Sequence, residues 1–418
     1  MITPVLGCIA DDYTGASDLS SMLVRTGLRV IQCFGVPAAD LDVTGHDAVV
    51  VALKSRSVAP VDAVRLSLQA LEALKAMPCQ RYFFKYCSTF DSTPHGNIGP
   101  VADALADALD ADSVLFCPSF PENGRTVYSG YLFVEGVPLH ESSMRHHPLN
   151  PMTDSNLVRV LATQSSRPVS LWEYASQKRP SGHLIVDAID DQDLEAVADA
   201  AAEDILLTGG SPVAAAWAGR VCDGTAADVP QLRSSEPVSD GAANAAAASR
   251  LPRFVVLAGS CSKATRAQIE EFRQLEPMLR LDVDAAVRGD DVVGEAVRWC
   301  EQYHNQKAVL ICSAPPTLDG ETAANHCSED AAKVIENTFA GIARQLVEGG
   351  LRRLIVAGGE TSGAVINALR IRAVRIGREV APGVPWIHSQ SEPPVSLALK
   401  SGNFGGRGFF HDAMRLAE

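Results

Sequence analysis

The 418-residue sequence lacks the short motifs that identify several common classes of protein. It has no GxxxxGK(S/T) run, which excludes a P-loop nucleotide-binding protein. No GxGxxG follows an apolar run, so the dinucleotide-binding fingerprint of many dehydrogenases is also missing. The ten cysteines include no CxxC pair, and the histidines at 140, 146 and 147 do not have the spacing of a zinc site. These absences disfavour a dehydrogenase and a zinc protein.

Long apolar runs and an excess of basic residues are missing too. No apolar run reaches the roughly 18 residues of a membrane span, and no basic segment precedes the first apolar run as it would in an export signal. Lys and Arg number 36 against 50 Asp and Glu, a formal net charge of −14, which argues against a nucleic-acid partner. The scattered cysteines are typical of reduced thiols. We therefore expect a cytoplasmic protein that binds neither membrane nor nucleic acid.

The length and composition predict two ordinary globular domains. A chain of 418 residues, 46% hydrophobic and 21% charged, exceeds the size at which one core keeps growing. The segment 234–250, SSEPVSDGAANAAAASR, is polar and then Ala-rich, and offers little to bury. It is interpreted as a domain boundary, although an Ala-rich surface helix is the alternative. We predict a first domain at residues 1–235 and a second at 252–418.

Short apolar runs alternate with amphipathic stretches along the whole chain. The runs are rich in Val, Ile and Leu, which suits strands buried on both faces of a parallel sheet. They are expected at Val5–Ala10, Ala48–Leu53, Tyr82–Tyr86, Val114–Cys117, Leu184–Asp187, Phe254–Ala258, Ala308–Cys312 and Leu354–Ala357. The predicted fold class is therefore α/β, with two domains of mainly parallel sheets flanked by helices and a ligand cleft between them.

The first expected strand runs into the acidic turn IADDYTGASD. Ligands of open α/β sheets gather at the carboxyl ends of strands. Asp11 and Asp12 lie there, followed by the Thr14 hydroxyl and by Gly15, which permits close backbone approach. A carboxylate at this position would accept a proton from a substrate hydroxyl. Its oxygens would alternatively cap the following helix.

A second polar segment, KYCSTFDSTPHGNIGP, follows an aromatic strand at residues 85–100. It is dense in hydrogen-bonding groups, which suits a polyhydroxylated ligand. The alternative is a Ser/Thr-rich turn that satisfies its own backbone. A lysine at a strand end in a cleft pairs readily with a carboxylate. The candidate residues are Lys85, Ser88, Thr89, Asp91 and Ser92.

Two arginines add positive charge near these segments. Arg56 follows the expected strand Ala48–Leu53. Arg125 follows the turn signal Asn123-Gly124, and its planar guanidinium suits bidentate recognition of a carboxylate. The Pro-rich, polar stretch after His140 is predicted to be irregular, either a lid or a surface loop without a role.

The second domain contains three turns of small residues that follow strands. They are GSCSKAT after Phe254–Ala258, GGETSG after Leu354–Ala357, and KSGNFGG near the end. Small residues at a strand-to-helix turn leave backbone N–H groups available to an anion. One such turn alone is ordinary linkage, but three together favour ATP. Glu360 would hold Mg²⁺, or would only complement the helix dipole.

These segments, together with CPSFPENGRTVYSGYLFVEGVPLHES and HPLNPMTDSNLVR, resemble the four-carbon acid sugar kinase family over nearly the whole chain. The resemblance implies an N-terminal sugar-acid-binding domain and a C-terminal ATP-binding domain. It also implies phosphorylation of a C4 hydroxyl, with the branch acting on 3-oxo-tetronate the most similar. ATP contacts of the family map here onto Ser260, Ser262, Gly358, Gly359, Glu360, Thr361, Gly363, Gly402, Asn403 and Gly405.

The resulting hypothesis assigns a role to each candidate. Lys85 and Arg125, with Arg56, bind the substrate carboxylate, and Asp12, or Asp91 as second choice, accepts the proton of the C4 hydroxyl. The remaining substrate contacts are Asp11, Thr14, Ser88, Thr89, Ser92 and Asn156. The alternatives are a threonate or erythronate kinase and a non-catalytic sugar-acid sensor. The sequence leaves the metal ligands unassigned and a homo-oligomer open.

Overall fold

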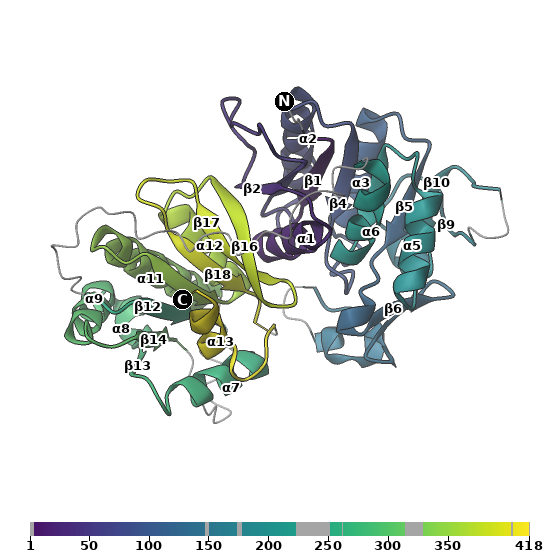
Figure 1. Cartoon of the computed structure of the whole chain (residues 1–418). Coiled ribbons are helices and arrows are strands. Elements are labelled where there is room, and N and C mark those ends of the chain that lie inside the picture. The colour runs from purple at the N-terminus through teal and green to yellow at the C-terminus, as the bar shows by residue number, and fades with distance from the viewer. Residues whose placement is uncertain are drawn as a thin grey trace. The chain divides into compact units, whose positions relative to one another are not determined.

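The computed structural model describes residues 4–146, 150–173, 178–222, 251–260, 262–313, 329–402 and 404–417. The chain forms two compact units, Met1–Val229 and Pro230–Glu418, which are seen in the purple-to-teal and green-to-yellow parts of Figure 1. The expected boundary segment 234–250 lies outside the described residues, so the predicted domain limits stay predictions. No helix in the described part of the chain is long and apolar enough to cross a membrane.

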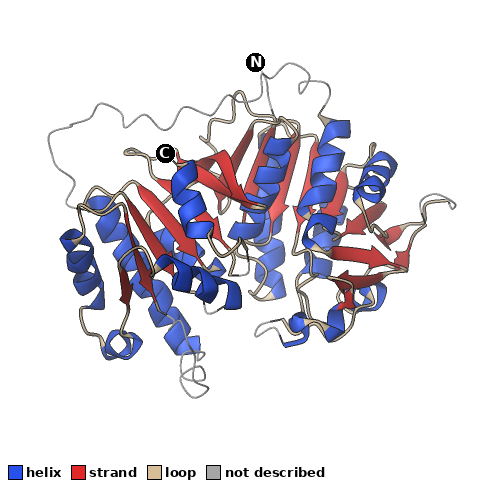
Figure 2. Ribbon diagram, turned by 60° about the horizontal axis from the view of Figure 1, so that its bottom comes forward, coloured by secondary structure: helices blue, strands red, loops and turns tan. Residues whose placement is uncertain are grey.

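Unit 1 contains a parallel sheet flanked by helices (Figure 2). The strand order is β2-β3-β1-β4-β11-β5-β10-β9, and each neighbouring pair is parallel. The strands are β1 (Leu6–Ala10), β2 (Val30–Phe34), β3 (Ala48–Ala52), β4 (Arg81–Lys85), β5 (Ser113–Cys117), β9 (Val169–Leu171), β10 (Gly182–Ile185) and β11 (Leu206–Gly209). The helices are α1 (Tyr13–Arg25), α2 (Pro60–Ala76), α3 (Ile98–Ala108), α4 (Leu157–Ala162), α5 (Asp191–Ala200) and α6 (Ser211–Val221).

The start of unit 1 shows why this sequence folds as it does. Each residue of β1 is buried, as expected for a central strand with helices on both faces. Asp12 then caps α1, its carboxylate accepting a hydrogen bond from the Gly15 N–H. The helix ends at Arg25, and Gly27, with φ of +91°, reverses the chain in the left-handed conformation that glycine tolerates.

A small antiparallel sheet lies beside the main sheet of unit 1. Its strands are β6 (Arg125–Tyr128), β7 (Tyr131–Val134) and β8 (Val137–Pro138). The Asp187 carboxylate, just past β10, accepts hydrogen bonds from the backbone N–H groups of Ser129 and Gly130 in the β6–β7 turn. The stretch predicted to be irregular instead contains short 3₁₀ helices at Leu139–Glu141 and Ser143–His146.

Unit 2 contains a mixed sheet with the order β13-β14-β12-β15-β18-β17-β16. The first five strands in this order are parallel to one another. Strand β17 is antiparallel to both of its neighbours, β18 and β16. The strands are β12 (Phe254–Ala258), β13 (Met278–Arg280), β14 (Ala308–Cys312), β15 (Arg353–Ala357), β16 (Ala373–Ala381), β17 (Val384–Ser389) and β18 (Ser396–Lys400). The helices are α7 (Lys263–Phe272), α8 (Val283–Arg288), α9 (Val292–Gln302), α11 (Glu329–Glu348), α12 (Gly359–Ala368) and α13 (Phe409–Leu416).

Apolar side chains of α7 and α13 pack on the sheet of unit 2. Ile269 and Phe272 of α7 join Phe410 and Met414 of α13 in one buried cluster with strands β12, β14 and β15. Both units therefore confirm the predicted α/β class with mainly parallel sheets. The antiparallel strands β6–β8 and β16–β17 were not predicted.

Candidate active site

Three neighbouring strands of unit 1 end in register at the residues that the sequence singled out. Ala10, the last residue of β1, is paired with Ala52 of β3 on one side and with Lys85 of β4 on the other. Because all three strands are parallel, the segments that follow them leave the sheet side by side. They carry Asp11 and Asp12 after β1, Arg56 after β3, and the polar segment 85–100 after β4.

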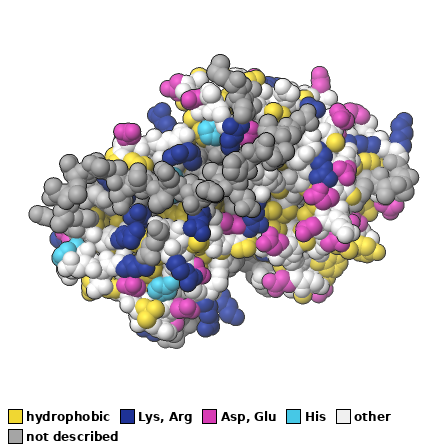
Figure 3. Space-filling view, viewed as in Figure 1, with side chains coloured by type: hydrophobic (Ala, Val, Ile, Leu, Met, Phe, Trp, Pro, Cys, Tyr) yellow, Lys and Arg dark blue, Asp and Glu magenta, His cyan; other side chains and the backbone are white. Residues whose placement is uncertain are grey.

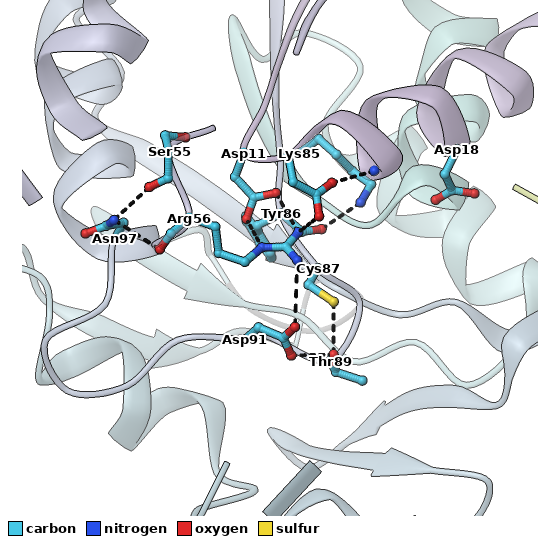
Figure 4. Close-up of polar contacts among 12 residues, drawn as sticks. Asp11, Asp18, Ser55, Arg56, Lys85, Tyr86, Cys87, Thr89, Asp91 and Asn97 are labelled. Carbon is cyan, nitrogen blue, oxygen red and sulfur yellow. Dashed lines mark hydrogen bonds and ion pairs between the residues drawn. The ribbon is translucent and has the colours of Figure 1, made fainter. Parts of the chain in front are cut away.

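Arg56 is the centre of the polar cluster that results (Figure 4). Its Nε and Nη2 donate bidentate hydrogen bonds of 2.8 Å to the two carboxylate oxygens of Asp11. Nη2 also forms an ion pair of 2.8 Å with Asp12 Oδ2, and Nη1 lies 3.8 Å from Asp91 Oδ2. One guanidinium thus holds three carboxylates together, and the net charge of this group is negative.

Burial and charge act against each other in this cluster. Burial raises the pKa of Asp11, although the neighbouring Arg56 guanidinium lowers it. For Arg56, burial alone would lower the pKa, but the attraction of Asp11 and Asp12 raises it well above its usual range. The Asp12 side chain is 27% exposed, whereas those of Asp11 and Asp91 are each 7% exposed. Asp12 is therefore the carboxylate that a ligand reaches most easily.

Lys85 lies at the same edge of the sheet. Its residue is 3% exposed, and its Nζ donates a hydrogen bond of 2.9 Å to the Tyr86 carbonyl oxygen. A Cβ atom added to Gly15 would lie 3.4 Å from this Nζ and 2.5 Å from Asp12 Oδ1, so the absence of a side chain at Gly15 allows the Asp12 carboxylate to lie close to the helix backbone. The positive charge of Lys85 also favours the ionised form of Asp11, lowering its pKa.

The segment after β4 places further hydroxyl groups against Asp91. Thr89 Oγ1 donates a hydrogen bond of 2.6 Å to Asp91 Oδ1 and lies 2.9 Å from Cys87 Sγ. Ser92 is buried, and its Oγ has no hydrogen-bond partner among the described residues. Thr14 and Ser88 are half-buried. Four of the predicted hydroxyl residues thus lie on the two segments that flank the cluster.

Asn97, which lies in the polar segment 85–100 but is not among the candidate residues, fixes the shape of the Arg56 segment. Its Nδ2 donates hydrogen bonds to three backbone carbonyl oxygens, those of Ser55, Arg56 and Val58, at 2.7, 3.1 and 2.9 Å. The side chain is buried. The segment between β3 and α2 is therefore tied to the start of α3, which holds Arg56 in place.

Two predicted residues have other partners in the described structure. Arg125 starts β6 of the small sheet, and its Nη1 donates to the Asn123 carbonyl oxygen. Asn156 caps α4, its Oδ1 accepting a hydrogen bond of 2.9 Å from the Arg159 N–H. Among the described residues, neither side chain has a hydrogen bond or an ion pair to Arg56.

In unit 2, three neighbouring parallel strands likewise end side by side, and the turns that follow them contain mainly neutral residues. Ala258 ends β12 opposite Ala357 of β15, which is in turn opposite Lys400 of β18. The three predicted turns follow these three parallel neighbours, so they leave the sheet along one stretch of its edge. The three turns, which the sequence marked separately, thus lie on a single surface of backbone and small side chains.

The first and third turns contact each other directly. Ser262 caps α7, and its Oγ donates a hydrogen bond of 2.5 Å to the Gly402 carbonyl oxygen. A Cβ atom on Gly402 would lie 2.5 Å from Ser260 Oγ and 3.0 Å from Ser262 Oγ. Gly402 is therefore required for the close approach of these turns. Asn403 lies outside the described residues.

The second turn starts a helix without a capping side chain. Gly358, with φ of +130°, precedes α12, and no side chain caps the helix. A Cβ atom on Gly358 would lie 3.2 Å from the Ser260 backbone nitrogen. Thr361 and Gly363 are buried in the first turns of α12, whereas Gly359 and Glu360 are exposed. The partial positive charge of this helix start is favourable for an anion.

Sequence reasoning missed two buried residues at this surface. Gln268 of α7 is 1% exposed, and its Nε2 lies 3.1, 2.9 and 2.9 Å from the carbonyl oxygens of Phe404, Gly405 and Gly406. It clamps the third turn from within the helix. Lys400 is fully buried at the end of β18. Its position at a strand end, like that of Lys85, is the sequence signal that could have identified it.

The described residues contain no group of three or more His, Cys, Asp or Glu side chains placed to hold a metal ion. Mg²⁺ in phosphoryl-transfer sites is bound by one or two carboxylates together with phosphate oxygens and water. The exposed Glu360 carboxylate at the start of α12 fits that limited role. On the face seen in Figure 3, basic and acidic side chains are interspersed.

Comparison with known proteins places these two surfaces in a functional class. Residues 6–217 match the sugar-binding N-terminal domain family, and residues 255–410 match the nucleotide-binding C-terminal domain family. The polar cluster of unit 1 lies in the first match and the three turns of unit 2 lie in the second. This pairing defines an enzyme that transfers a group from a nucleotide to a sugar.

Curated relatives cover the full chain. A 3-oxo-tetronate kinase from Burkholderia multivorans is 44% identical over 99% of this chain and 97% of its own length. The 3-oxo-tetronate kinase from Haemophilus influenzae is 40% identical over 98% and 99% of the two chains. The chain belongs to the four-carbon acid sugar kinase family, as its motifs indicated. It is a kinase of the class that phosphorylates alcohol groups.

Solved structures support the fold. A crystal structure of a Salmonella typhimurium LT2 protein matches with a TM-score of 0.82 and 38% identity, covering 98% of both chains. A Haemophilus influenzae protein matches with a TM-score of 0.75 and 38% identity, covering 99% of this chain and 100% of its own. The α/β architecture of both units is thus the architecture of experimentally determined relatives.

Proposed function

We propose that the protein uses ATP to phosphorylate the C4 hydroxyl of 3-oxo-tetronate, yielding 3-oxo-tetronate 4-phosphate and ADP in the cytoplasm. The observation that carries this proposal is the matched pair of strand-end surfaces. One contains carboxylates, hydroxyls and a buried lysine, and the other contains three glycine-rich turns. Full-length relatives named 3-oxo-tetronate kinase supply the substrate.

Asp12 is the proposed general base. It is the most exposed carboxylate of the cluster, and its contact with Arg56 Nη2 holds it in place. Its oxygens would accept a hydrogen bond from the C4 hydroxyl and then take the proton as the phosphoryl group is transferred. Asp91 is the second choice, because it is buried and already accepts a hydrogen bond from Thr89.

The remaining groups of unit 1 would bind and orient the sugar acid. Lys85 would bind the substrate carboxylate as a positive charge, and Arg125 would be its second cationic partner. Asp11, Thr14, Ser88, Thr89, Ser92 and Asn156 would contact the substrate's other oxygens. Arg56 is already paired with Asp11 and Asp12, so its main contribution is to hold these two carboxylates in place.

The turns of unit 2 would bind the phosphates of ATP. Phosphoryl transfer depends mostly on positioning and on stabilising charge. Backbone N–H groups at the start of α12 and the Ser260 side chain would supply the charge stabilisation, and Ser262 would hold the third turn in position through its hydrogen bond to Gly402. Mg²⁺, held at Glu360 together with the phosphates, would neutralise charge on the transferred group. Transfer requires the bound nucleotide and the C4 hydroxyl to meet.

The decisive assay incubates the purified protein with MgATP and a panel of four-carbon acids and follows ADP release. We expect 3-oxo-tetronate to give the highest kcat/KM, with threonate and erythronate lower. Faster turnover of threonate or erythronate would assign the protein to the alternative kinase activity. If a sugar acid binds but no acid of the panel causes ADP release, the kinase proposal is contradicted. The non-catalytic sugar-acid sensor would then be the remaining alternative.

Asp12→Asn tests the general base. Asparagine is as good a helix cap as aspartate, so the variant should fold and bind ATP as the wild type does. Turnover should fall on the order of a hundredfold or more, because the proton acceptor is lost. Asp190→Asn is the matched control, since Asp190 caps α5 in the same way by accepting from the Asp193 N–H. Normal turnover of Asp12→Asn would remove Asp12 from this role.

A further inference from the structure

Lys400 is a buried cation beneath the three turns of unit 2. It is the last residue of β18 and is 0% exposed. Its Nζ donates hydrogen bonds of 3.0 Å to Thr265 Oγ1, in the first turn of α7, and of 3.1 Å to the Gly402 carbonyl oxygen. An ammonium has three N–H donors. In the described part of the chain, the acceptors of the Lys400 ammonium are these two neutral oxygens.

The Gly402 carbonyl oxygen is held on the inner side of the turn by several donors. Besides Lys400 Nζ, it accepts hydrogen bonds from Ser262 Oγ and from Thr265 Oγ1, the latter at 2.9 Å. A carbonyl oxygen that faced outward would repel a phosphate. Lys400 Nζ therefore contacts the third turn through this carbonyl oxygen, together with the two hydroxyl donors.

The charge of Lys400 has no carboxylate partner in the described part of the chain. It contacts α7, the third turn and α13, where the Phe409 ring centroid lies 5.8 Å from Nζ. The carboxylates of Glu271 in α7 and Asp412 in α13 lie beside Gly408. Glu360, at the start of α12, is exposed. Burial lowers the pKa of Lys400 to about 7, with no charged neighbour contributing.

The Lys400 ammonium and the N-terminal end of α7, both positive, therefore lie close together without an acidic partner among the described residues. Nζ lies at the first turn of α7, whose N-terminal end has a partial positive charge of its own. The combination is unfavourable in the free protein and becomes favourable when an anion binds on the turns. Lys85 of unit 1 differs in this respect, because its charge acts on the neighbouring Asp11.

We propose that Lys400 is a positioning residue of the nucleotide site, whose buried charge favours the phosphates of ADP and ATP from behind the Gly402 turn. This inference rests on the proposed ATP-binding role of the turns. It assigns a buried cation to a surface that otherwise has backbone groups, hydroxyl groups and the exposed Glu360 carboxylate. The charge acts strongly because the protein interior screens it less than water does.

Lys400→Met in the full-length protein tests the proposal. Methionine keeps the length and apolar stem, and the Gly402 carbonyl oxygen retains its two hydroxyl donors. Affinities for adenosine, AMP and ADP are measured by calorimetry. We expect ADP affinity to fall about tenfold to a hundredfold, AMP affinity to fall less, and adenosine affinity to change little. The unfolding temperature should not fall, since a buried charge is removed. Lys333→Met, an exposed lysine of α11, is the charge-loss control.

Proton uptake gives an independent readout. ADP binding to the wild type at about pH 8, measured in buffers of different ionisation enthalpy, should take up a larger fraction of a proton than binding to Lys400→Met. The phosphates raise the low pKa of Lys400, so that a proton is bound. If Lys400→Met does not fold, wild-type uptake decides by itself: uptake supports the proposal and its absence overturns it.

The remaining outcomes are also decisive. Unchanged ADP affinity in Lys400→Met overturns the proposal, as does an equal loss for adenosine and ADP, which would indicate that the lysine only holds the shape of the turn. If the wild type binds no adenine nucleotide, the proposed function fails and this inference fails with it. Wild-type binding with no charge-dependent loss in the variant removes the role of Lys400 alone.

Discussion

At the scale of single residues, the cluster around Arg56 shows how a carboxylate-rich site is kept folded. Asp11 is buried, and an unpaired buried carboxylate would either cost several kcal/mol or bind a proton. The bidentate contact from Arg56 prevents both. One arginine thus allows two neighbouring aspartates to remain side by side, one buried and one reachable by a ligand.

Removing this arginine should destabilise unit 1 in a pH-dependent way. Arg56→Met leaves Asp11 buried without its partner, which should lower the free energy of unfolding by about 3–5 kcal/mol at neutral pH. The pKa of Asp11 in the folded state then rises further above its unfolded value. An acid with a raised folded pKa destabilises the fold above that pKa, so the loss should shrink as the pH falls from about 8 to about 5.

Urea denaturation of the wild type and Arg56→Met at both pH values measures this effect. Arg159→Met is the control, because Arg159 pairs with Asp154 at an exposed site, and exposed pairs contribute about 1 kcal/mol or less. A loss in Arg56→Met that is the same at both pH values would show that packing, and not the Asp11 charge, is the reason.

At the scale of elements, both surfaces arise from the same device. In each unit, three adjacent parallel strands end in register, β3-β1-β4 in one and β12-β15-β18 in the other. The chain then leaves the sheet at three neighbouring points. Residues that are up to about 140 positions apart, such as Ser262 and Gly402, are brought into hydrogen-bond distance by this pairing alone.

Gly402→Ala should weaken nucleotide binding without unfolding the protein. The added Cβ atom would lie 2.5 Å from Ser260 Oγ, so the serine side chain must move from its place in the proposed nucleotide site. We expect ATP affinity to fall on the order of tenfold, with sugar-acid affinity unchanged. Gly406→Ala is the matched control in the same segment, since no atom lies within 4 Å of its added Cβ. Equal affinities of the two variants would contradict the close approach.

The sequence was informative where buried strands are uniformly apolar. The runs Phe254–Ala258 and Ala308–Cys312 coincide with β12 and β14. It was uninformative where polar residues are buried by tertiary partners. Strand β2 contains the fully buried Gln32, which is bonded to Ser17 and Ser20 of α1, so its run does not appear uniformly apolar. Strand β16 contains the exposed Arg375 and Arg378, so it lacks the signal of a strand buried on both faces.

The site was predictable to the same extent. Acidic and glycine-rich turns that follow strands can be recognised in the sequence as candidate binding segments, because ligands gather at strand ends. Gln268 could not be identified, since it lies inside a helix and its partners at 404–406 are about 136 to 138 residues away. The partners of Arg125 and Asn156 likewise depend on the small sheet and on the cap of α4, which no sequence pattern marked. Their proposed substrate contacts stay predictions.

At the scale of the whole molecule, the proposal divides one reaction between two units of a single chain. The carboxylate cluster belongs to unit 1 and the glycine-rich turns to unit 2. Neither unit has both the hydroxyl-activating and the phosphate-binding groups. Because the units are covalently joined, each sugar-acid site has a nucleotide site at high effective concentration. Two chains are therefore not required for one turnover.

Mixing two impaired variants tests this directly, with ATP kept below the wild-type KM so that the affinity defect of Gly402→Ala lowers the rate. Asp12→Asn carries its defect in unit 1 and Gly402→Ala in unit 2, so each variant retains one intact unit. If both halves of the reaction use the units of one chain, an equimolar mixture should have only the mean of the two separate activities, as followed by ADP release. If the reacting units came from different chains of an oligomer, intact pairs would form in the mixture. Activity would then recover to about a quarter of the wild-type value in a randomly assembled dimer. We expect no recovery, because the covalent link already supplies each unit 1 with its own unit 2.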